Sequence, residues 1–263
     1  MLSQADRRAA SDLLWQHWQE GRRLAELPAE IRPRTRAEAY KVQALLECRS
    51  RAPLFGWKIA ATSAAGQAHI NVDGPLAGRL LREKAFASGA ELPFGANHMR
   101  VAEPEFAFRM AHDLPPRAEP YSIADVADAV GTLHSAIEIP DSRYEDFTAV
   151  GAAQLIADNA CAHLFVLGDP APDSWRNMDL AAHQVTARVR GKIERDGRGS
   201  NVLAGPLDAL TWLANELSGL GLTLKAGEVV TTGTCTIPLP IGQGDEVEAG
   251  FGELGRVSLR FGD

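Results

Sequence analysis

The sequence has few cysteines, and none of them are close together. Its 263 residues include only three, Cys48, Cys161 and Cys235, and no Cys-x-x-Cys pair. This spacing argues against a cysteine-based zinc site and a disulfide framework, and it favours a reducing compartment. We interpret each cysteine as a small buried residue and not as a nucleophile.

The sequence also lacks a long apolar run, a signal peptide and a dense basic cluster. No stretch is long and apolar enough to cross a bilayer, and the N-terminus has no apolar segment followed by a cleavage site. The formal net charge is −7, which disfavours a nucleic-acid-binding surface. The sequence therefore predicts a cytoplasmic protein with no membrane or nucleic-acid partner. It also contains no Gly-x-Ser-x-Gly motif and no phosphate-binding loop.

The elements that are present predict an α+β fold. Apolar residues make up 45% of the chain. Helices are expected over 3–20, from Thr35, over 122–130 and over 207–217, each with a capping residue or proline at its start. Strands are expected near 54–60, 101–110, 133–139, 185–193 and 228–261. We divide the chain into an N-terminal helical portion, residues 1–53, and a β-rich catalytic domain, residues 54–263, whose mixed β core carries peripheral helices.

Two acids lie close together in the strand-like run from Val101 to Phe108. Glu103 and Glu105 are two residues apart, which places both on one face of a strand. Pro104 between them predicts an edge strand. Glu138 interrupts a second apolar run, and three carboxylates on β-structure are the oxygen ligands that Mg²⁺ or Mn²⁺ prefers. The alternative is a solvent-facing pair of acids, with Glu138 bound to an arginine.

A lysine and a hydroxyl-rich turn are further candidates for chemistry. Lys58 lies between Trp57 and Ile59, so burial would lower its pKa towards a range useful for proton transfer. The turn from Thr231 to Thr236 offers hydroxyls and N–H groups to a carboxylate. A solvent-facing lysine and an ordinary turn are the alternatives.

Two more polar positions follow the Glu138 strand. Arg143 is able to bind a substrate carboxylate, and a structural salt bridge is an equal alternative. Asp158 and Asn159 lie among small apolar residues, where a polar pair is buried and satisfied, caps a helix or lines a pocket.

Taken together, several segments resemble the 2-keto-4-pentenoate hydratases, a group that includes 2-oxohept-3-ene-dioate hydratases and 4-oxalocrotonate decarboxylases within the fumarylacetoacetate hydrolase superfamily. The resemblance runs from about Thr35 to Phe261. The segments occur in the family order, and they are Gly56-Trp57-Lys58-Ile59, Glu103-Pro104-Glu105-Phe106-Ala107-Phe108, Ala136-Ile137-Glu138-Ile139-Pro140-Asp141-Ser142-Arg143, Ile156-Ala157-Asp158-Asn159-Ala160, Gly205-Pro206-Leu207-Asp208-Ala209-Leu210 and Thr232-Gly233-Thr234.

The resemblance implies a mixed β-roll core of the family's C-terminal type and a Mg²⁺ or Mn²⁺ ion held by Glu103, Glu105 and Glu138. It implies that Lys58 transfers protons or orients water, and that Thr234 contacts the substrate carboxylate. With Arg143 and Asn159 as further substrate-binding candidates, the expected activity is addition of water to a 2-hydroxy-2,4-dienoate in aromatic meta-cleavage catabolism.

The resemblance leaves alternatives for the reaction and the assembly. They are decarboxylation of a 2-oxo-dienedioate, hydrolysis of an acylpyruvate, and a non-catalytic subunit that associates with a paralogous enzyme. A homo-oligomer is implied by analogy. One segment departs from the family pattern, because family hydratases often have an acid and a tyrosine where this chain has Leu76 and Ala77. His69, just upstream, is a candidate replacement for the missing acid.

Overall fold

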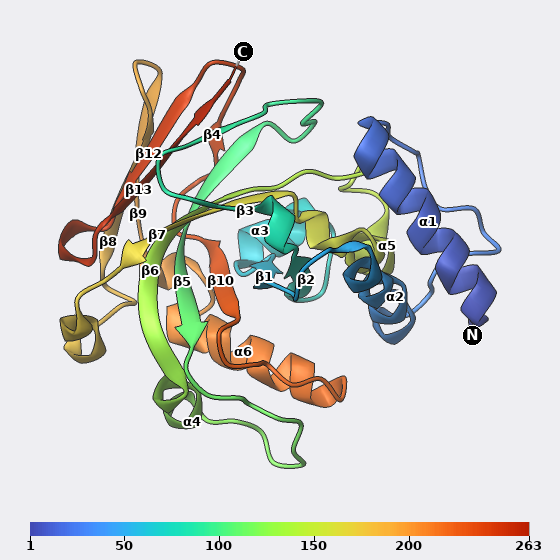
Figure 1. Cartoon of the computed structure of the whole chain (residues 1–263), viewed down its shortest axis with the longest axis horizontal. Coiled ribbons are helices and arrows are strands. Elements are labelled where there is room, and N and C mark those ends of the chain that lie inside the picture. Colours follow the sequence, from blue (N-terminus) through green and yellow to red (C-terminus); the bar gives the residue numbers. More distant parts are fainter. Residues whose placement is uncertain (263) are drawn as a thin grey trace.

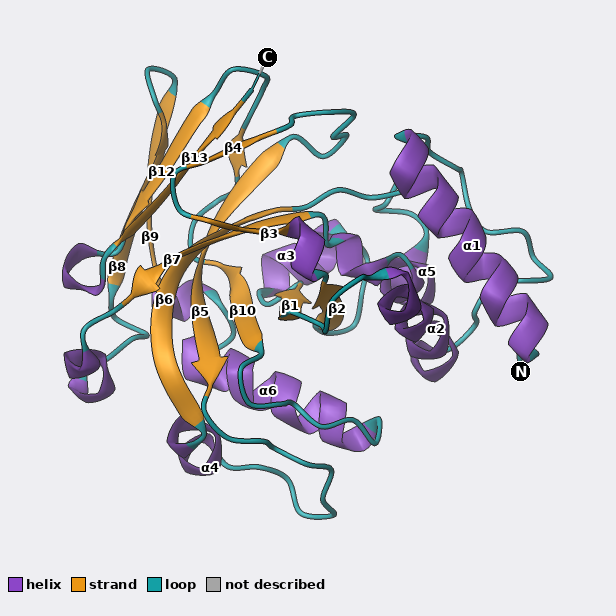
Figure 2. Cartoon of the chain, viewed as in Figure 1, coloured by secondary structure: helices purple, strands orange, loops and turns teal. Residues whose placement is uncertain are grey.

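The computed structural model describes residues 1–262 and has a mixed α+β architecture. Two β-sheets lie side by side, with helices around their periphery, and α1 lies on the far side of α2 from the sheets (Figures 1 and 2). The predicted fold class is confirmed. No helix in the described part of the chain has both the length and the apolarity needed to cross a membrane.

The larger sheet has eight strands in the order β2-β1-β10-β5-β6-β7-β3, with β11 beside β5. Its long central strands, β5 and β6, pair antiparallel over most of their length. The strands are β1 (Gly56–Ala60), β2 (Leu76–Leu80), β3 (Ala85–Ala87), β5 (Val101–Met110), β6 (Val130–Ile139), β7 (Leu164–Pro170), β10 (Val229–Thr234) and β11 (Leu239–Pro240).

The smaller sheet has the order β4-β13-β12-β8-β9. Its β8–β9 hairpin closes through Gly191, whose φ of 71° suits a tight turn. Phe106 of β5 packs edge-on against Phe251 at 5.0 Å between ring centroids, which joins the two sheets. The strands are β4 (Ala90–Leu92), β8 (Gln184–Val189), β9 (Ile193–Arg198), β12 (Glu246–Gly250) and β13 (Arg256–Phe261).

The predicted helix starts are confirmed. Ser3 forms a capping box, Thr35 accepts a hydrogen bond from the backbone N–H of Glu38, and Pro206 occupies the first turn of the last helix. The helices are α1 (Gln4–Glu20), α2 (Arg36–Gln43), α3 (Ala64–His69), α4 (Ile123–Asp128), α5 (Gly151–Ala157) and α6 (Pro206–Gly219).

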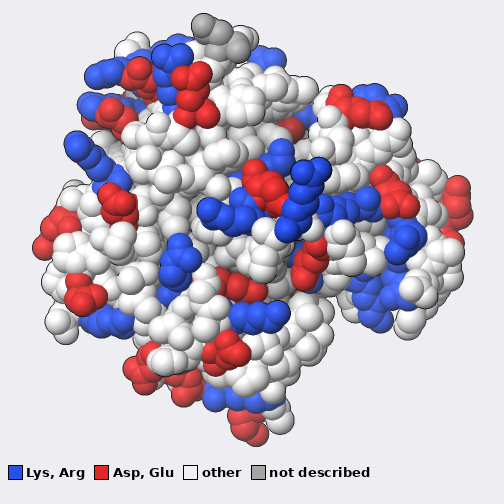
Figure 3. Space-filling view, in the orientation of Figure 1, with Lys and Arg blue, Asp and Glu red and all other residues white. Residues whose placement is uncertain are grey.

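The N-terminal helices are tied to the rest of the chain by long-range hydrogen bonds. The Gln43 side chain donates to the carbonyl groups of Ala77 and Ile156, and the Trp18 indole donates to His163. The division at residue 53 stays a prediction. On the face shown in Figure 3, basic and acidic side chains are interspersed and wide areas carry neither, in keeping with a modest net charge.

The predicted edge position of β5 is wrong, because β5 lies between β10 and β6. The Pro104 carbonyl accepts a hydrogen bond from the Cys235 N–H, so the proline nitrogen faces the same neighbour. On that side of β5, the neighbouring segment lies between the end of β10 at Thr234 and the start of β11 at Leu239, so it belongs to neither strand. A missing N–H therefore breaks no ladder hydrogen bond there, and a proline is tolerated inside the sheet.

A buried ion pair joins the end of β6 to the segment after α5. Arg143 donates through Nε to the Asp158 carboxylate, and both side chains are almost completely buried. Ser142 donates to the same carboxylate at 2.8 Å, and Arg143 Nη1 donates to the Asp141 carbonyl at 2.7 Å. Arg143 and Asp158 therefore compensate each other's charge, and removing either side chain would leave the other charge buried without a partner.

We expect Asp158→Ala to lower the free energy of unfolding by about 3–5 kcal/mol, because it leaves the Arg143 guanidinium buried without its counter-charge. Urea denaturation measures this loss. The matched control is Glu248→Ala, which removes the partner of Arg188 in an exposed pair and has a much smaller effect. Equal losses in the two variants would contradict a structural role for the buried pair.

Candidate metal centre

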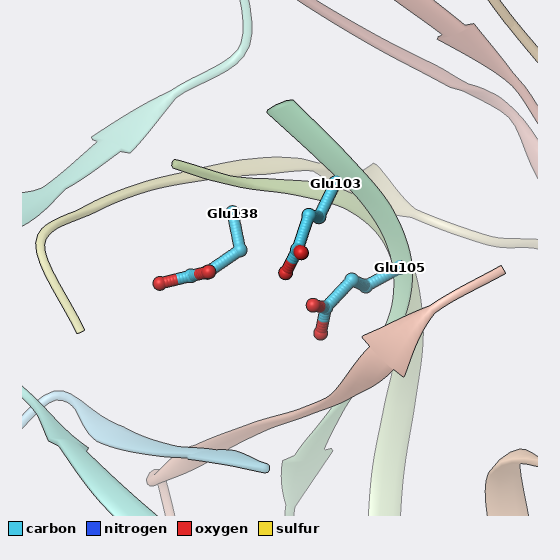
Figure 4. A group of neighbouring side chains, drawn as sticks. All are labelled: Glu103, Glu105 and Glu138. Atoms are coloured by element: carbon cyan, nitrogen blue, oxygen red, sulfur yellow. The ribbon is translucent and has the colours of Figure 1, made fainter. Parts of the chain in front are cut away.

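Three glutamates meet on one face of the larger sheet. Glu103 and Glu105 come from β5, and the register places Glu103 directly opposite Glu138 of β6. Their carboxylates point into a common space (Figure 4). One oxygen from each lies within 4.8 Å of the others. The alternation of the strands therefore brings together the three acids that the sequence predicted as metal ligands.

These carboxylates are buried and incompletely hydrogen-bonded. Glu105 and Glu138 are fully buried, whereas Glu103 is half-buried. Glu105 Oε2 accepts from the Gly233 N–H at 2.7 Å and from the Thr231 hydroxyl. Glu105 Oε1 and both oxygens of Glu138 have no hydrogen-bond partner among residues 1–262. Since unpaired buried carboxylate oxygens are costly, this cluster calls for a ligand.

Burial and mutual repulsion set the protonation of the cluster. Burial first, and then the charge of Glu103, raise the pKa of Glu105 to about 7. Burial likewise raises the pKa of Glu138 well above its ordinary value. The raised pKa values of Glu105 and Glu138 indicate that too little positive charge lies nearby to stabilise their ionised forms.

Lys58 of β1 supplies part of that charge. Its Nζ lies 3.5 Å from Glu138 Oε2 and donates to the Ala160 carbonyl at 3.1 Å. Burial lowers the pKa of Lys58, but the neighbouring carboxylates, Glu138 foremost, outweigh burial and leave that pKa above its usual value. The prediction of a lowered pKa is therefore wrong for the chain by itself, since a lysine among three acids stays charged.

Charge balance indicates the kind of ligand that fits. If all three carboxylates are ionised, they and one ammonium leave two uncompensated negative charges in a buried space. A divalent cation that prefers oxygen ligands would balance both charges and bond the unpaired oxygens. The donor set contains no sulfur or imidazole, so a hard ion is favoured over zinc.

A strained segment holds Lys58 in place. Asn159, Ala160 and Cys161 all have positive φ, at 57°, 50° and 60°. Such conformations cost on the order of 1–3 kcal/mol each in residues other than glycine, so surrounding contacts must impose them. The Asn159 side chain supplies two of these contacts. It accepts a hydrogen bond from the Arg79 N–H at 2.6 Å and donates one to the Arg79 carbonyl at 2.8 Å.

A cavity of about 590 Å³ opens beside the carboxylates. Lys58, Glu103, Gly233 and Thr234 line one part of it, and Glu105 and Glu138 lie just behind Glu103. Leu76, where the sequence departs from the family pattern, also lines the wall, as does His69. A small ligand in this cavity would therefore reach the cluster through Glu103.

The predicted substrate-binding residues fall into two groups. Thr234 lines the cavity, and its hydroxyl donates to the Thr236 carbonyl at 2.9 Å, so its substrate contact stays a prediction. Arg143 and Asn159 do not line the cavity, and their polar groups are engaged with Asp158 and the Arg79 backbone. These contacts give both side chains a structural role, and a substrate contact for either residue stays a prediction.

The sequence did not reveal which groups orient Glu105. Thr231 and the Gly233 N–H hold its carboxylate, although the turn that contains them was interpreted as a substrate contact. Gly233 has a φ of 102°, and a Cβ there would lie 2.0 Å from the Thr62 hydroxyl oxygen. The Thr-Thr-Gly-Thr run showed that hydrogen-bond donors gather in this turn. It did not show that they bind Glu105, which is 126 residues away from Thr231.

Gly78 provides a test of the strained segment. A Cβ on Gly78 would lie 2.4 Å from the Asn159 carbonyl oxygen and 3.1 Å from Lys58 Cγ. We therefore expect Gly78→Ala to lower the free energy of unfolding by about 1–3 kcal/mol. Thermal or urea denaturation would show it. Gly74→Ala is the control, because its Cβ meets nothing within 4 Å, and an equal effect there would argue against close packing at Gly78.

Comparisons with known proteins agree with this geometry. Residues 82–261 match the family model of the fumarylacetoacetate (FAA) hydrolase C-terminal domain. A 2-keto-4-pentenoate hydratase from Burkholderia vietnamiensis is 34% identical over 79% of this chain and 78% of its own length. A 2-oxo-hept-4-ene-1,7-dioate hydratase from Escherichia coli is 30% identical over 85% of this chain and 86% of its own.

A solved structure extends the similarity over the whole chain. The 4-oxalocrotonate decarboxylase from Pseudomonas putida G7, complexed with magnesium and adipate, has a TM-score of 0.89 and 26% identity, covering 99% of each chain. The resemblance seen in the sequence motifs is thereby confirmed. The chain belongs to the fumarylacetoacetate hydrolase family, in the group of 2-keto-4-pentenoate hydratase-like hydro-lyases.

Proposed function

We propose that this chain is a divalent-metal-dependent hydratase. It adds water to a 2-hydroxy-2,4-dienoate of the 2-keto-4-pentenoate type and yields a 4-hydroxy-2-oxo acid, a step of aromatic meta-cleavage catabolism. The observation that carries this proposal is the cluster of unpaired buried carboxylate oxygens, with Lys58 beside it, at the wall of a cavity.

Glu103, Glu105 and Glu138 would hold Mg²⁺ or Mn²⁺. When bound there, such an ion supplies Lewis acidity to the carboxylate and 2-oxo oxygens of a 2-oxo acid. The Gly233 N–H and the Thr231 hydroxyl keep Glu105 in one orientation, so its remaining oxygen points into the cluster. This support reduces the reorganisation that binding requires.

The reaction moves two protons and adds one water molecule. The dienol loses its hydroxyl proton and gains a proton at C5, and water then adds its oxygen at C4 and a proton at C3. The Lys58 ammonium, which contacts the Ala160 carbonyl and Glu138, would orient water or substrate and exchange a proton. Thr234 lies in the same wall, and its hydroxyl would donate to the substrate carboxylate in place of the Thr236 carbonyl.

The relatives support the same chemistry. Curated proteins that match at 30–34% identity carry the name 2-keto-4-pentenoate hydratase, and the similar decarboxylase structure contains magnesium and a dicarboxylic acid. The three carboxylates would hold the cation, and the cation together with the lysine would bind an anionic substrate in the same site.

Decarboxylation is a second candidate, because the 4-oxalocrotonate decarboxylase fold matches along the entire chain. The same site would act on a 2-oxo-dienedioate and release CO₂ instead of forming an alcohol. Product analysis separates the two reactions. Association with further copies of the chain, or with a paralogous decarboxylase, stays a prediction.

With Mg²⁺ or Mn²⁺, we expect the protein to remove the ultraviolet absorbance of 2-hydroxypenta-2,4-dienoate and form 4-hydroxy-2-oxopentanoate. Glu105→Gln should lower kcat/KM by about 100-fold or more, because it removes one charge from the proposed metal site. Chelation of the metal should abolish the reaction, and added Mg²⁺ should restore it.

Glu253→Gln is the matched control, since Glu253 is exposed and distant in sequence from the cluster. It should react at the unaltered rate. Absence of alcohol product with either metal, or an unchanged rate in Glu105→Gln, would refute the hydratase assignment. Release of CO₂ from a dienedioate with no alcohol product would favour the second candidate.

A further inference from the structure

The cavity is larger than the reacting part of the proposed substrate requires. Its volume of about 590 Å³ lies within the range of pockets that enclose drug-sized molecules. A five-carbon dienoic acid has only eight non-hydrogen atoms. With its carboxylate and 2-oxo group at Glu103 and Lys58, it would leave much of the space empty.

The remaining wall is predominantly apolar, although Thr62, Ser63, Asn201 and Thr236 also line the cavity. Leu76 of β2 and Leu155 of α5 line it and are fully buried, and Ile70 and Phe147 line it and are half-buried. Ile237 also lines the cavity, yet 71% of its surface is exposed, so it lies at the opening. The apolar surface therefore continues from the interior to the rim.

Positive charge is scarce away from the cluster. Among the described residues that line the cavity, Lys58 and His69 are the only basic side chains. Lys58 is engaged with Glu138 and the Ala160 carbonyl, and the His69 ring packs edge-on against Phe147 at 6.0 Å. Arg195 donates to the carbonyl of the wall residue Pro238 at 2.7 Å, but it does not line the cavity.

We propose that this chain takes a 2-hydroxy-2,4-dienoate whose C5 carries an uncharged alkyl or aryl substituent, and that it discriminates against dienedioates. The inference rests on the proposed function for the head of the substrate. A second carboxylate would face Leu76, Leu155 and Phe147 without a free cation, and an apolar group would bury surface there. The substrate class thus follows from the wall opposite the metal centre.

Calorimetric binding of saturated 2-oxo acids in the presence of Mg²⁺ tests the inference without turnover. The series is 2-oxopentanoate, 2-oxooctanoate and 2-oxooctanedioate. We expect affinity to rise about fourfold for each methylene that enters the apolar wall. The dioate should bind at least about tenfold more weakly than the monoacid of equal length, because its second charge is desolvated without a partner.

Two substitutions at the rim sharpen the test. Ile237→Ser should weaken binding of 2-oxooctanoate and leave 2-oxopentanoate unchanged, and Ile237→Arg should improve binding of the dioate. Ile237 is exposed, so neither change disturbs the core. The control is Ile123→Ser on α4, an isoleucine that is 46% exposed and does not line the cavity, and it should alter neither affinity.

The outcomes separate this inference from the proposed function. If the dioate binds as tightly as 2-oxooctanoate, or binds through a contact that His69→Phe removes, the substrate class is wrong while the metal site and hydratase assignment stand. If none of the three acids binds in the presence of Mg²⁺, the proposed function fails together with the inference.

Discussion

The structure depends on the repulsion between three carboxylates that the sheet register forces together. Glu103 and Glu138 are cross-strand neighbours, and Glu105 is two residues further along the same face. Strand pairing prevents them from moving apart, and burial deprives them of water. Lys58 compensates one of the charges, which explains why its own pKa is raised and not lowered. A divalent cation is the ligand that completes this balance.

Much of the surrounding structure keeps the cluster in one arrangement. Thr231 and the Gly233 N–H orient Glu105, and the left-handed segment from Asn159 to Cys161 presents the Ala160 carbonyl to Lys58. Strain of this kind is maintained only where several contacts over-determine it, as the paired hydrogen bonds between Asn159 and the Arg79 backbone do. Apolar side chains, among them Leu76, Leu155 and Phe147, predominate in the rest of the cavity wall.

Local signals in the sequence were sufficient for several helix starts and for the choice of the three candidate metal ligands. Ser3, Thr35 and Pro206 marked helix starts because capping is a property of a few consecutive residues. The two-residue spacing of Glu103 and Glu105 placed them on one face for the same reason. Non-local facts were not accessible. Pro104 indicated an edge strand, since nothing nearby shows that β10 ends opposite it. The partners of Arg143 and Asn159 likewise depend on chain segments that only the folded structure brings together.

The central claim is that Glu103, Glu105 and Glu138 bind one divalent cation. A crystal structure of the protein grown with Mn²⁺ and oxalate, with anomalous diffraction recorded at the manganese absorption edge, tests it most directly. The account predicts a single strong anomalous peak with one oxygen of each glutamate about 2.1 Å away and oxalate completing the shell on the cavity side. Manganese bound elsewhere, or no peak between these carboxylates at saturating Mn²⁺, would contradict it.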